Sequence, residues 1–502
     1  MNKRGLWLAT AIFLVAVGVR LWVLFGVTDP QNAGVGWYTD TYHHWQIAYL
    51  SKEIGLEQGR LWDLKGMEYF WGIGQPALLI ALFALTGSAD ILVLRLLTVV
   101  CGSLFAIFLY LLVRRYWGLR PALAMALLAV FSPVAIFTDI SGLQPPLGWL
   151  ALVLGFFFWP KQPVLTAFFW VLAGTFRAEF WLIGGVLTFL ALLFEKNFDR
   201  RVVLLVSYLL LSAVHMKILY SATGNPIYPV YWNYRGNMAG EWVGKQPGEV
   251  VLSDFMKNVQ LGCKLAFAVC TAGMLFLWRR KDLKQRLFFA WGLVNLGFLA
   301  GMAAFSDYAI MFEMPHFWYS QLFTWPYDFL ALLIVLFFFV WLPKKWPFWT
   351  KLSGLNWLVV VLLLVGFSFN AWPVIMGRYR DYQIDWQNDV KAAQLIGSVY
   401  EQGKIIMPAD RPDLVYATVK YGGVKGKDVV GDMYDPLNYA GKGASYVDGT
   451  LQEEFVEWLK KEKITTFVAY MAGKYEPIFS QRPGYLQLVG NSDYIKVFRV
   501  KL

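Results

Sequence analysis

The stretch LWLATAIFLVAVGVRLWVLFGV, residues 6–27, decides the fold class of this chain. It is apolar throughout except for one charged residue, Arg20. A bilayer core about 30 Å thick needs roughly 20 such residues in a helix. The run is longer than the apolar region of a signal peptide, and no small-residue cleavage site follows it. We therefore predict that residues 6–27 form the first membrane-spanning helix.

The rest of the chain has the same apolar character. Of its 502 residues, 58% are hydrophobic, 18% are aromatic and only 16% are charged, which is unlike a soluble domain. Further apolar segments lie near residues 91–113, 120–139, 147–160, 163–176, 180–195, 201–221, 259–278, 287–305, 327–342 and 354–373. These segments predict a polytopic α-helical membrane protein with about 11 spans. Those between 147 and 195 are short, so some are expected to be broken or re-entrant helices.

The positions of lysine and arginine predict how the chain is oriented, because short cytoplasmic loops are enriched in both. With the N-terminus inside, the inner side receives the basic run at 279–286 and Lys3, Arg4, Arg114, Arg115, Arg120, Lys161, Lys196, Arg200, Arg201, Lys344, Lys345 and Lys351. The segment 28–90 then faces outward. The net charge of +11 is mostly this topology signal, so we expect no nucleic-acid partner.

The composition changes after residue 373, where charges of both signs mix with strand and helix patterns. LQEEFVEWLKKEK (451–463) is amphipathic at the helical period, and ITTFVAY (464–470) is a β-branched strand. We predict a transmembrane domain at 1–373, with its first outer loop at 28–90, and an extracytoplasmic α/β domain at 374–502 that handles the acceptor or shields the active site. All three cysteines, Cys101, Cys263 and Cys270, fall in predicted spans, so the exterior domain is expected to have no disulfide.

The first outer loop contains the leading catalytic candidate, Asp40. DTYHHWQIAYLSKEIG (40–55) has amphipathic helical character, which puts Asp40 near a helix start, where the dipole favours an ionised carboxylate. An aspartate that only caps the helix would fit the same position. His43 and His44 follow at i+3 and i+4 and could hold a divalent metal with Asp40, but the sequence offers no convincing third ligand. We expect one histidine to hydrogen-bond Asp40 or the acceptor and the other to pack.

Six segments carry a family resemblance: YTDTYHHWQIAYLSKEIG (38–55), YFWGIGQPALLIALFALTG (69–87), LRLLTVVCGSLFAIFLYLLVRRYWG (94–118), SGLQPPLGWLALVLGFF (141–157), LAGTFRAEFWLIGG (172–185) and GNPIYPVYWNYRGN (224–237). In their order, spacing and sidedness they resemble the GT-C membrane glycosyltransferases of the protein mannosyltransferase and aminoarabinose transferase kind, which are similar to glycosyltransferase family 39. The resemblance covers residues 1–345, and an exterior C-terminal domain fits the same plan.

The resemblance implies a multi-pass cell-membrane hexosyl- or pentosyltransferase that works on the outer face. It would move a sugar, with inversion, from a polyprenyl-phosphate donor to a lipid, glycan or protein acceptor. Asp40 matches the family's first-loop catalytic aspartate and would act as the general base. Many relatives have a second acid at the next position, where this chain has Thr41. No cofactor is implied, and a divalent metal remains the alternative.

A lipid phosphate leaving group needs a cation beside it, and arginine suits this role because its fork matches phosphate oxygens. The candidates for binding the donor phosphate are Arg177, Lys217, Arg235, His215 and His316. Arg177 lies with Glu179 in an apolar stretch, where ionisable groups are costly and suggest function, although the two could also form a structural pair. Candidate substrate contacts on the outer face are Tyr42, His43, His44, Glu68, Tyr69, Glu179 and Glu313.

Two other classes of protein share part of this pattern. A secondary transporter or flippase also has many spans, but it usually shows internal repeats, and none is evident in this sequence. A lipid-linked polysaccharide ligase or polymerase also uses polyprenyl carriers, and it would be expected to place its key arginines in a large loop late in the chain. The candidate acid lies at the beginning of this chain, which favours the GT-C interpretation. The missing second acid leaves an inactive relative as a third possibility.

Overall fold

The computed structural model describes residues 3–28, 39–55, 61–62, 67–233, 334–408, 411–431, 449–470 and 484–502. The chain divides into two compact units. The first, which we call the helical unit, consists of Met1–Gly34, Tyr69–Gln75 and Leu92–Gly377. The second, the sheet unit, consists of Val35–Glu68, Pro76–Ile91 and Arg378–Leu502. The sheet unit therefore combines most of the first loop with the C-terminal residues.

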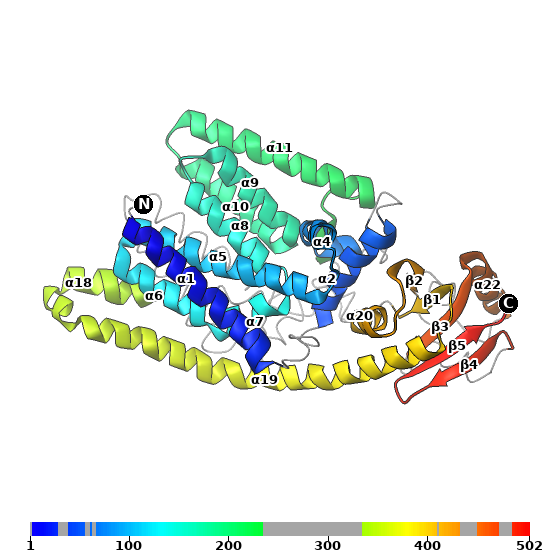
Figure 1. The fold of residues 1–502 in the computed structure, drawn as a ribbon. Helices are drawn as coiled ribbons and strands as arrows, with labels where there is room; N and C mark the ends of the chain where they lie inside the picture. The colour runs from blue at the N-terminus through cyan, green and yellow to red at the C-terminus, as the bar shows by residue number, and fades with distance from the viewer. Residues whose placement is uncertain are drawn as a thin grey trace, which may run out of the picture. The chain divides into compact units, whose positions relative to one another are not determined.

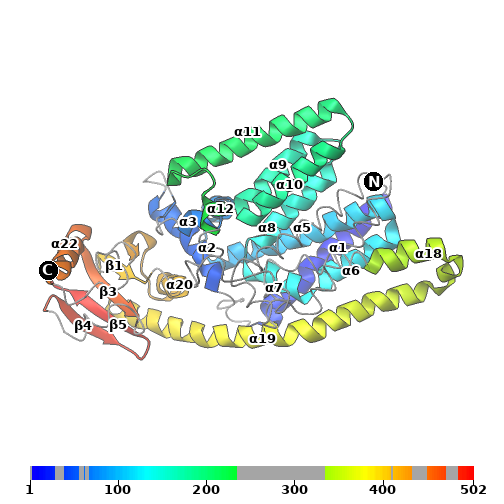
Figure 2. The ribbon, with the colours of Figure 1, turned by 180° about the vertical axis from the view of Figure 1, so that it is seen from behind.

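Apolar helices make up the helical unit (Figure 1). They are α1 (Lys3–Trp22) with a π-helical turn at Val23–Val27, α5 (Ile91–Trp117), α6 (Leu119–Phe131), α7 (Pro133–Ser141), α8 (Pro145–Phe158), α9 (Pro163–Phe176), α10 (Ala178–Phe194), α11 (Phe198–Thr223), α12 (Tyr228–Asn233), the turns Phe337–Trp341 and Pro347–Leu352, and α18 (Leu342–Lys345). Helix α9 packs against α8, α10 and α11, as the view from behind also shows (Figure 2).

Several of these helices are suited to a lipid environment. Within the described ranges, four segments are long and apolar enough to cross a membrane: Gly5–Val27, Ile91–Trp117, Phe198–Thr223 and Pro347–Gly366. Helices α6 and α7 meet at a bend of 54° and pass the same test together, which raises the number to 5. Helices α8, α9 and α10 are shorter, in agreement with the short segments predicted between 147 and 195. The chain is a membrane protein.

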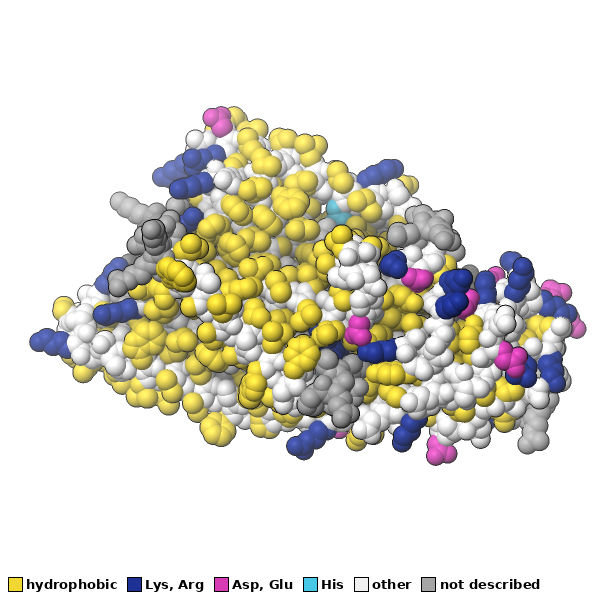
Figure 3. Space-filling model, viewed as in Figure 1, with side chains coloured by type: hydrophobic (Ala, Val, Ile, Leu, Met, Phe, Trp, Pro, Cys, Tyr) yellow, Lys and Arg dark blue, Asp and Glu magenta, His cyan; other side chains and the backbone are white. Residues whose placement is uncertain are grey.

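The predicted total of about 11 spans includes segments that lie outside the described residues, namely 259–278, 287–305 and the first part of 327–342, up to residue 333. The described helices expose many large apolar side chains, as expected of helices that contact lipid. Figure 3 shows apolar side chains over the face of the helical unit and a gathering of lysine and arginine side chains at the end where α11 begins.

Local sequence explains where the helices of the helical unit break. Ser132 caps α7 by accepting a hydrogen bond from the Ala135 backbone N–H at 3.4 Å, and Pro133 supplies the first residue of that helix. Gly142 ends α7 with φ +82°, which glycine adopts without steric cost. Arg177 separates α9 from α10 as a single extended residue with φ −155° and ψ 149°.

The sheet unit contains a five-stranded sheet with the order β2-β1-β3-β5-β4. The strands are β1 (Lys404–Met407), β2 (Val429–Gly431), β3 (Ile464–Tyr470), β4 (Leu486–Asn491) and β5 (Ile495–Val500). Strands β2, β1 and β3 run parallel, whereas β5 pairs antiparallel with both β3 and β4. Helix α22 (Gly449–Glu462) places Phe455 and Leu459 in a core with the buried strand residues Ile406 and Phe467.

Three further helical segments come from the first loop: α2 (Thr39–Leu50) with its π-helical turn Ser51–Gly55, α3 (Met67–Phe70) and α4 (Gly74–Thr86). Helix α2 packs against α20 (Pro412–Tyr421) in the sheet unit. The 47-residue helix α19 (Ser353–Val399) begins in the helical unit and, from Arg378 onward, belongs to the sheet unit.

Candidate functional site

Three interruptions of helical structure meet in the helical unit. The first is the turn between α3 and α4, where Gly72 has φ +111° and a Cβ would overlap the backbone carbonyl of Thr175. The second is the turn between α7 and α8, where the Gly142 carbonyl accepts a hydrogen bond from Gln75 Nε2 at 3.2 Å. The third is Arg177, whose Nη1 donates to Gln144 Oε1 at 3.3 Å. Segments far apart in the sequence thus bring polar groups to one place.

Arg177 and Glu179 form the charged part of this cluster. Arg177 Nε and Nη2 donate to the two carboxylate oxygens of Glu179 at 3.2 and 3.1 Å. Their side chains are only 12% and 8% exposed, so the pair is largely withdrawn from water. A two-bond contact between a guanidinium and a carboxylate fixes the plane of the guanidinium. The predicted association of Arg177 with Glu179 is therefore confirmed as a physical contact, compatible with either a structural or a functional role.

The start of helix α10 adds a partial positive charge next to the Arg177–Glu179 pair. Helix α10 begins at Ala178, directly after Arg177 in the sequence. The first backbone N–H groups of a helix have no hydrogen-bond partner within that helix. Glu179 is in the first turn, where the helix dipole stabilises a carboxylate. Helix N-termini favour anions for the same reason. This combination of a broken helix, an arginine and two glutamines suits an anionic polar group at an apolar boundary.

Asp40 lies in the sheet unit, in the first turn of α2, as the helical pattern predicts. Its side chain is partly exposed. His43 is also partly exposed, while His44 is buried. Tyr42 is buried among aromatic rings, stacking on Trp386 with centroids 5.6 Å apart. The ring of Tyr42 thus belongs to the packing that supports α2.

The remaining predicted residues lie in several environments. Glu68 and Tyr69 are both buried on the short helix α3. Lys217 is exposed on α11, with Nζ 5.9 Å from the centre of the Tyr220 ring. His215 is on the buried face of α11, with its ring 4.8 Å from that of Trp181. Arg235, Glu313 and His316 lie outside the described residues.

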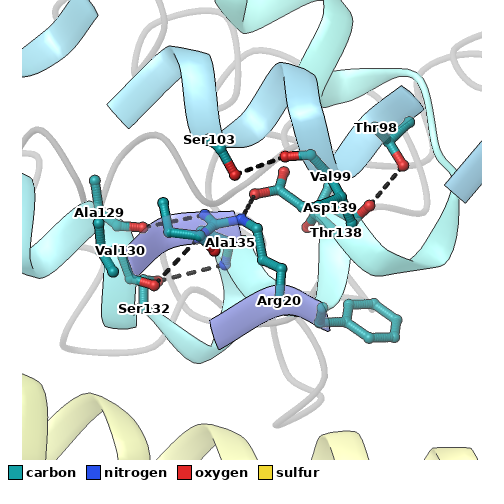
Figure 4. Close-up of polar contacts among 12 residues, drawn as sticks. Arg20, Thr98, Val99, Ser103, Ala129, Val130, Ser132, Ala135, Thr138 and Asp139 are labelled. Atoms are coloured by element: carbon teal, nitrogen blue, oxygen red, sulfur yellow. Dashed lines mark hydrogen bonds and ion pairs between the residues drawn. The ribbon is translucent and has the colours of Figure 1, made fainter. Parts of the chain in front are cut away.

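A second buried ion pair lies elsewhere in the helical unit (Figure 4). Arg20 Nε donates to Asp139 Oδ2 at 2.6 Å, and Nη1 donates to the Ala16 carbonyl at 3.1 Å. The Asp139 backbone carbonyl accepts from Thr98 Oγ1 at 2.5 Å. Helices α1, α5 and α7 are therefore joined by one polar network. Because every polar group that we name in this network has a partner within the unit, we interpret it as structural.

Sequence reasoning missed three polar members of these clusters: Gln75, Gln144 and Asp139. Each is a polar side chain within a largely apolar segment, and all three are buried. That contrast could have identified them, because buried polar groups need hydrogen-bond partners. Within the part of the chain that the structure describes, no group of three or more His, Cys, Asp and Glu side chains is arranged to hold a metal ion.

Comparison with solved structures identifies the fold. The crystal structure of ArnT from Cupriavidus metallidurans bound to undecaprenyl phosphate matches with a TM-score of 0.56 at 13% identity, covering 99% of this chain and 98% of that one. ArnT in the apo state gives 0.53 at 14% identity, covering 98% and 97%.

The archaeal oligosaccharyltransferase AglB from Archaeoglobus fulgidus, in complex with an inhibitory peptide and a dolichol-phosphate, gives a TM-score of 0.51 at 12% identity, covering 93% of this chain and 70% of that one. No protein-family model matches the sequence, and no curated protein matches it significantly. The chain has the GT-C fold that the motifs predict.

Proposed function

We propose that this chain is an integral membrane glycosyltransferase that takes a sugar from a polyprenyl-phosphate donor and transfers it, with inversion, to an acceptor on the outer face of the membrane. The observation that carries the proposal is the convergence of Arg177, Gln144 and Gln75 at three chain interruptions in a GT-C fold. Anionic headgroups of membrane lipids call for this kind of site, an arginine at the edge of an apolar bundle.

The donor class is suggested by the similar structures. One ArnT structure holds undecaprenyl phosphate, and the AglB structure holds a dolichol-phosphate. Both ligands join a long apolar chain to a phosphate. For the present chain we propose a donor of the same class, with its phosphate held by Arg177. Glu179 and Gln144 keep the guanidinium in position through the bonds described above.

The proposed orientation follows from the direction of the helices. Helices α7 and α8 meet at the turn that contains Gln144, and α9 and α10 meet at Arg177. The opposite ends of α8, α9 and α10 carry Lys161 and Lys196. Because basic loops remain in the cytoplasm, the cluster would lie at the outer side. We therefore place the N-terminus in the cytoplasm and residues 374–502 outside.

The proposed reaction uses Asp40 as its base. The Asp40 carboxylate takes the proton of the acceptor hydroxyl while the acceptor oxygen forms a bond to the anomeric carbon of the sugar. The bond between that carbon and the phosphate oxygen breaks, and the polyprenyl phosphate leaves with the bonding electron pair. Attack from the face opposite the leaving group inverts the anomeric centre. Arg177 stabilises the negative charge that develops on the phosphate.

Other roles remain proposals of the same kind. The residues that we propose as additional contacts to the donor phosphate or the substrates are Lys217, Arg235, His316, His43, His44, Glu68, Tyr69 and Glu179. Tyr42 is left out of this set because its ring is buried against Trp386. We propose a lipid, a glycan or a protein as the acceptor, since the step at Asp40 requires only a hydroxyl group on it.

The test is turnover of a panel of polyprenyl-phosphate sugars by the purified protein in lipid nanodiscs. The proposal predicts release of polyprenyl phosphate from at least one donor and formation of a glycoside whose anomeric configuration, measured by NMR, is opposite to that of the donor. A flippase would leave every donor of the panel uncleaved in nanodiscs, and in lipid vesicles it would move the donor from one leaflet to the other. A ligase would consume only a diphosphate-linked glycan. Either result would overturn the proposal.

A further inference from the structure

An aromatic cluster in the sheet unit joins the helix that carries Asp40 to the C-terminal part of the chain. Tyr42 on α2 stacks on Trp386 of α19 at 5.6 Å with an interplanar angle of 12°, and lies 5.3 Å from the ring of Tyr416 on α20. Trp45, one turn further along α2, meets Tyr416 edge-on at 4.8 Å. All four rings are buried. Such rings pack in defined orientations rather than sliding freely.

Tyr416 is the centre of this cluster because both its ring and its hydroxyl make contacts. The hydroxyl donates to Asp90 Oδ1 at 3.3 Å and accepts from the Ile91 backbone N–H at 3.4 Å. Lys420 Nζ donates to the same hydroxyl at 3.1 Å and to Asp90 Oδ2 at 2.7 Å. One side chain of α20 therefore contacts α2 and also Asp90 and Ile91, all within the sheet unit.

Two more contacts fix α2 along its length. Trp45 Nε1 donates to the Ala89 carbonyl at 2.6 Å. The ring of Tyr49 packs directly on Gly426, where a Cβ would lie 2.6 Å from it. Tyr42, Trp45 and Tyr49 are spaced at i, i+3 and i+7, so they share one face of α2. A helix held along one face cannot rotate about its axis.

Asp40 precedes Tyr42 by two residues on the same helix, so the direction of its carboxylate is set by the rotation of α2. We propose that Tyr416 is a positioning residue of the transfer reaction, holding α2, and through it Asp40, from the C-terminal part of the chain. This inference rests on the proposed function for its catalytic consequence. It gives the C-terminal residues a task in the reaction.

The test compares two matched pairs of variants in the full-length protein. Tyr416→Ala removes the ring contacts to α2, whereas Tyr416→Phe keeps them and loses only the hydroxyl. Tyr485→Ala and Tyr485→Phe are the controls, because Tyr485 is in the same unit but packs on a different core. The centre of its ring lies 6.5 Å from that of Phe455, in the core that α22 covers. Trp386→Leu is a second variant that loosens α2, in case Tyr416→Ala does not fold.

The readouts are steady-state kinetics and hydrogen exchange of the α2 amides. We expect Tyr416→Ala to lower kcat by about 10- to 100-fold, because small displacements of a reacting group are costly. Donor KM should stay within about twofold, since donor binding is not the step affected. Exchange in α2 should accelerate in Tyr416→Ala and Trp386→Leu. Tyr416→Phe should retain most of the wild-type kcat and most of the protection of the α2 amides from exchange. Both Tyr485 variants should match wild type.

Hydrogen exchange separates the two possible failures. If α2 exchange and kcat in Tyr416→Ala match wild type while Asp40→Asn is inactive, the positioning role is wrong and the proposed function stands. If Asp40→Asn is fully active, the proposed base is wrong, and accelerated α2 exchange in Tyr416→Ala would still support the anchoring of α2 by Tyr416. Equal losses of kcat in Tyr416→Ala and Tyr485→Ala would also overturn the inference, because they would indicate a general effect of destabilising the unit.

Discussion

Arg177, the single extended residue that separates α9 from α10, donates hydrogen bonds to both carboxylate oxygens of Glu179. This two-bond contact fixes the plane of the Arg177 guanidinium within the helical unit. It also explains how an apolar segment can contain two charges, because each compensates the other. Removing one charge and removing both should therefore have different consequences.

The first prediction concerns this pair. Glu179→Gln leaves Arg177 without its counter-charge and should destabilise the protein by about 3–5 kcal/mol. The double variant Arg177→Gln, Glu179→Gln removes both charges and should recover much of that stability. Its donor KM should nevertheless rise by about tenfold or more, because a hydrogen bond to a charged group contributes about 1.5–3 kcal/mol. Thermal unfolding and donor kinetics measure the two effects separately, and an unchanged donor KM in the double variant would exclude Arg177 as the phosphate contact.

The second prediction concerns the turn that packs beside Arg177. Gly72→Ala requires a residue with a side chain to adopt φ +111° and also pushes a Cβ into the Thr175 carbonyl. Gly87→Ala is the matched control, because Gly87 has φ +66° but no atom within 4 Å of the position of its Cβ. The control should lose about 1–2 kcal/mol from backbone strain alone, and Gly72→Ala should lose clearly more. Equal losses in thermal unfolding would mean that the turn does not pack on Thr175.

The third prediction concerns Arg20 and Asp139. Arg20→Met leaves a buried carboxylate without its partner, which should cost about 3–5 kcal/mol. Combining it with Asp139→Asn removes the unpaired charge, so the double variant should be more stable than Arg20→Met alone. A double-mutant cycle from thermal unfolding gives the coupling energy. Additive effects of the two substitutions would contradict the ion pair.

The fourth prediction concerns a buried carboxyl group in the sheet unit. Burial, together with the negative charge of Asp413, raises the pKa of Asp389 to about 8, although Arg411 Nη2 donates to Asp389 Oδ1 at 3.1 Å. In the unfolded chain the same group titrates near its ordinary value of 3.8. Between pH about 4 and about 8 the folded state therefore binds more protons at this group than the unfolded state does. The stabilisation from Asp389 is fully present below pH about 4 and is lost as the pH rises through about 8.

Asp389→Asn should remove this pH dependence, and Asp385→Asn, at an exposed position on the same helix, is the matched control. Free energies of unfolding measured between pH 5 and 9 in steps of about one unit would show a slope of at most about 1.4 kcal/mol per pH unit attributable to Asp389. A wild-type slope that persists in Asp389→Asn would assign the titration to another group.

Sequence pattern was sufficient for individual elements because their signals are local. The apolar runs at 91–113, 163–176 and 201–221 lie within α5, α9 and α11, and the helix start at Asp40 is confirmed in α2. In the C-terminal part, LQEEFVEWLKKEK and ITTFVAY correspond to α22 and β3. Hydrophobic period and capping residues act over a few positions, so they can be read directly from the chain.

The candidate site was only partly predictable, because its contacts join distant segments. Arg177 stood out as a charge in an apolar run, but its bond to Gln144 depends on how α7, α8 and α9 pack. Arg20 was evident in the first span, yet its partner Asp139 is 119 residues away. Tyr42 looked like a substrate contact because it adjoins Asp40. Its stacking on Trp386 of α19 depends on the fold of the sheet unit and has no signal within the first loop.

The most direct test of the proposed function is single-turnover transfer by Asp40→Asn beside wild type, with donor binding measured on the same samples. Glu53→Gln is the control, because Glu53 is a first-loop carboxylate that pairs with Lys52 at 2.9 Å in the turn after α2. We predict that Asp40→Asn binds the polyprenyl-phosphate donor as wild type does but transfers the sugar at least about 100-fold more slowly, the range lost with a general base. Transfer by Asp40→Asn at the wild-type rate would contradict the assignment.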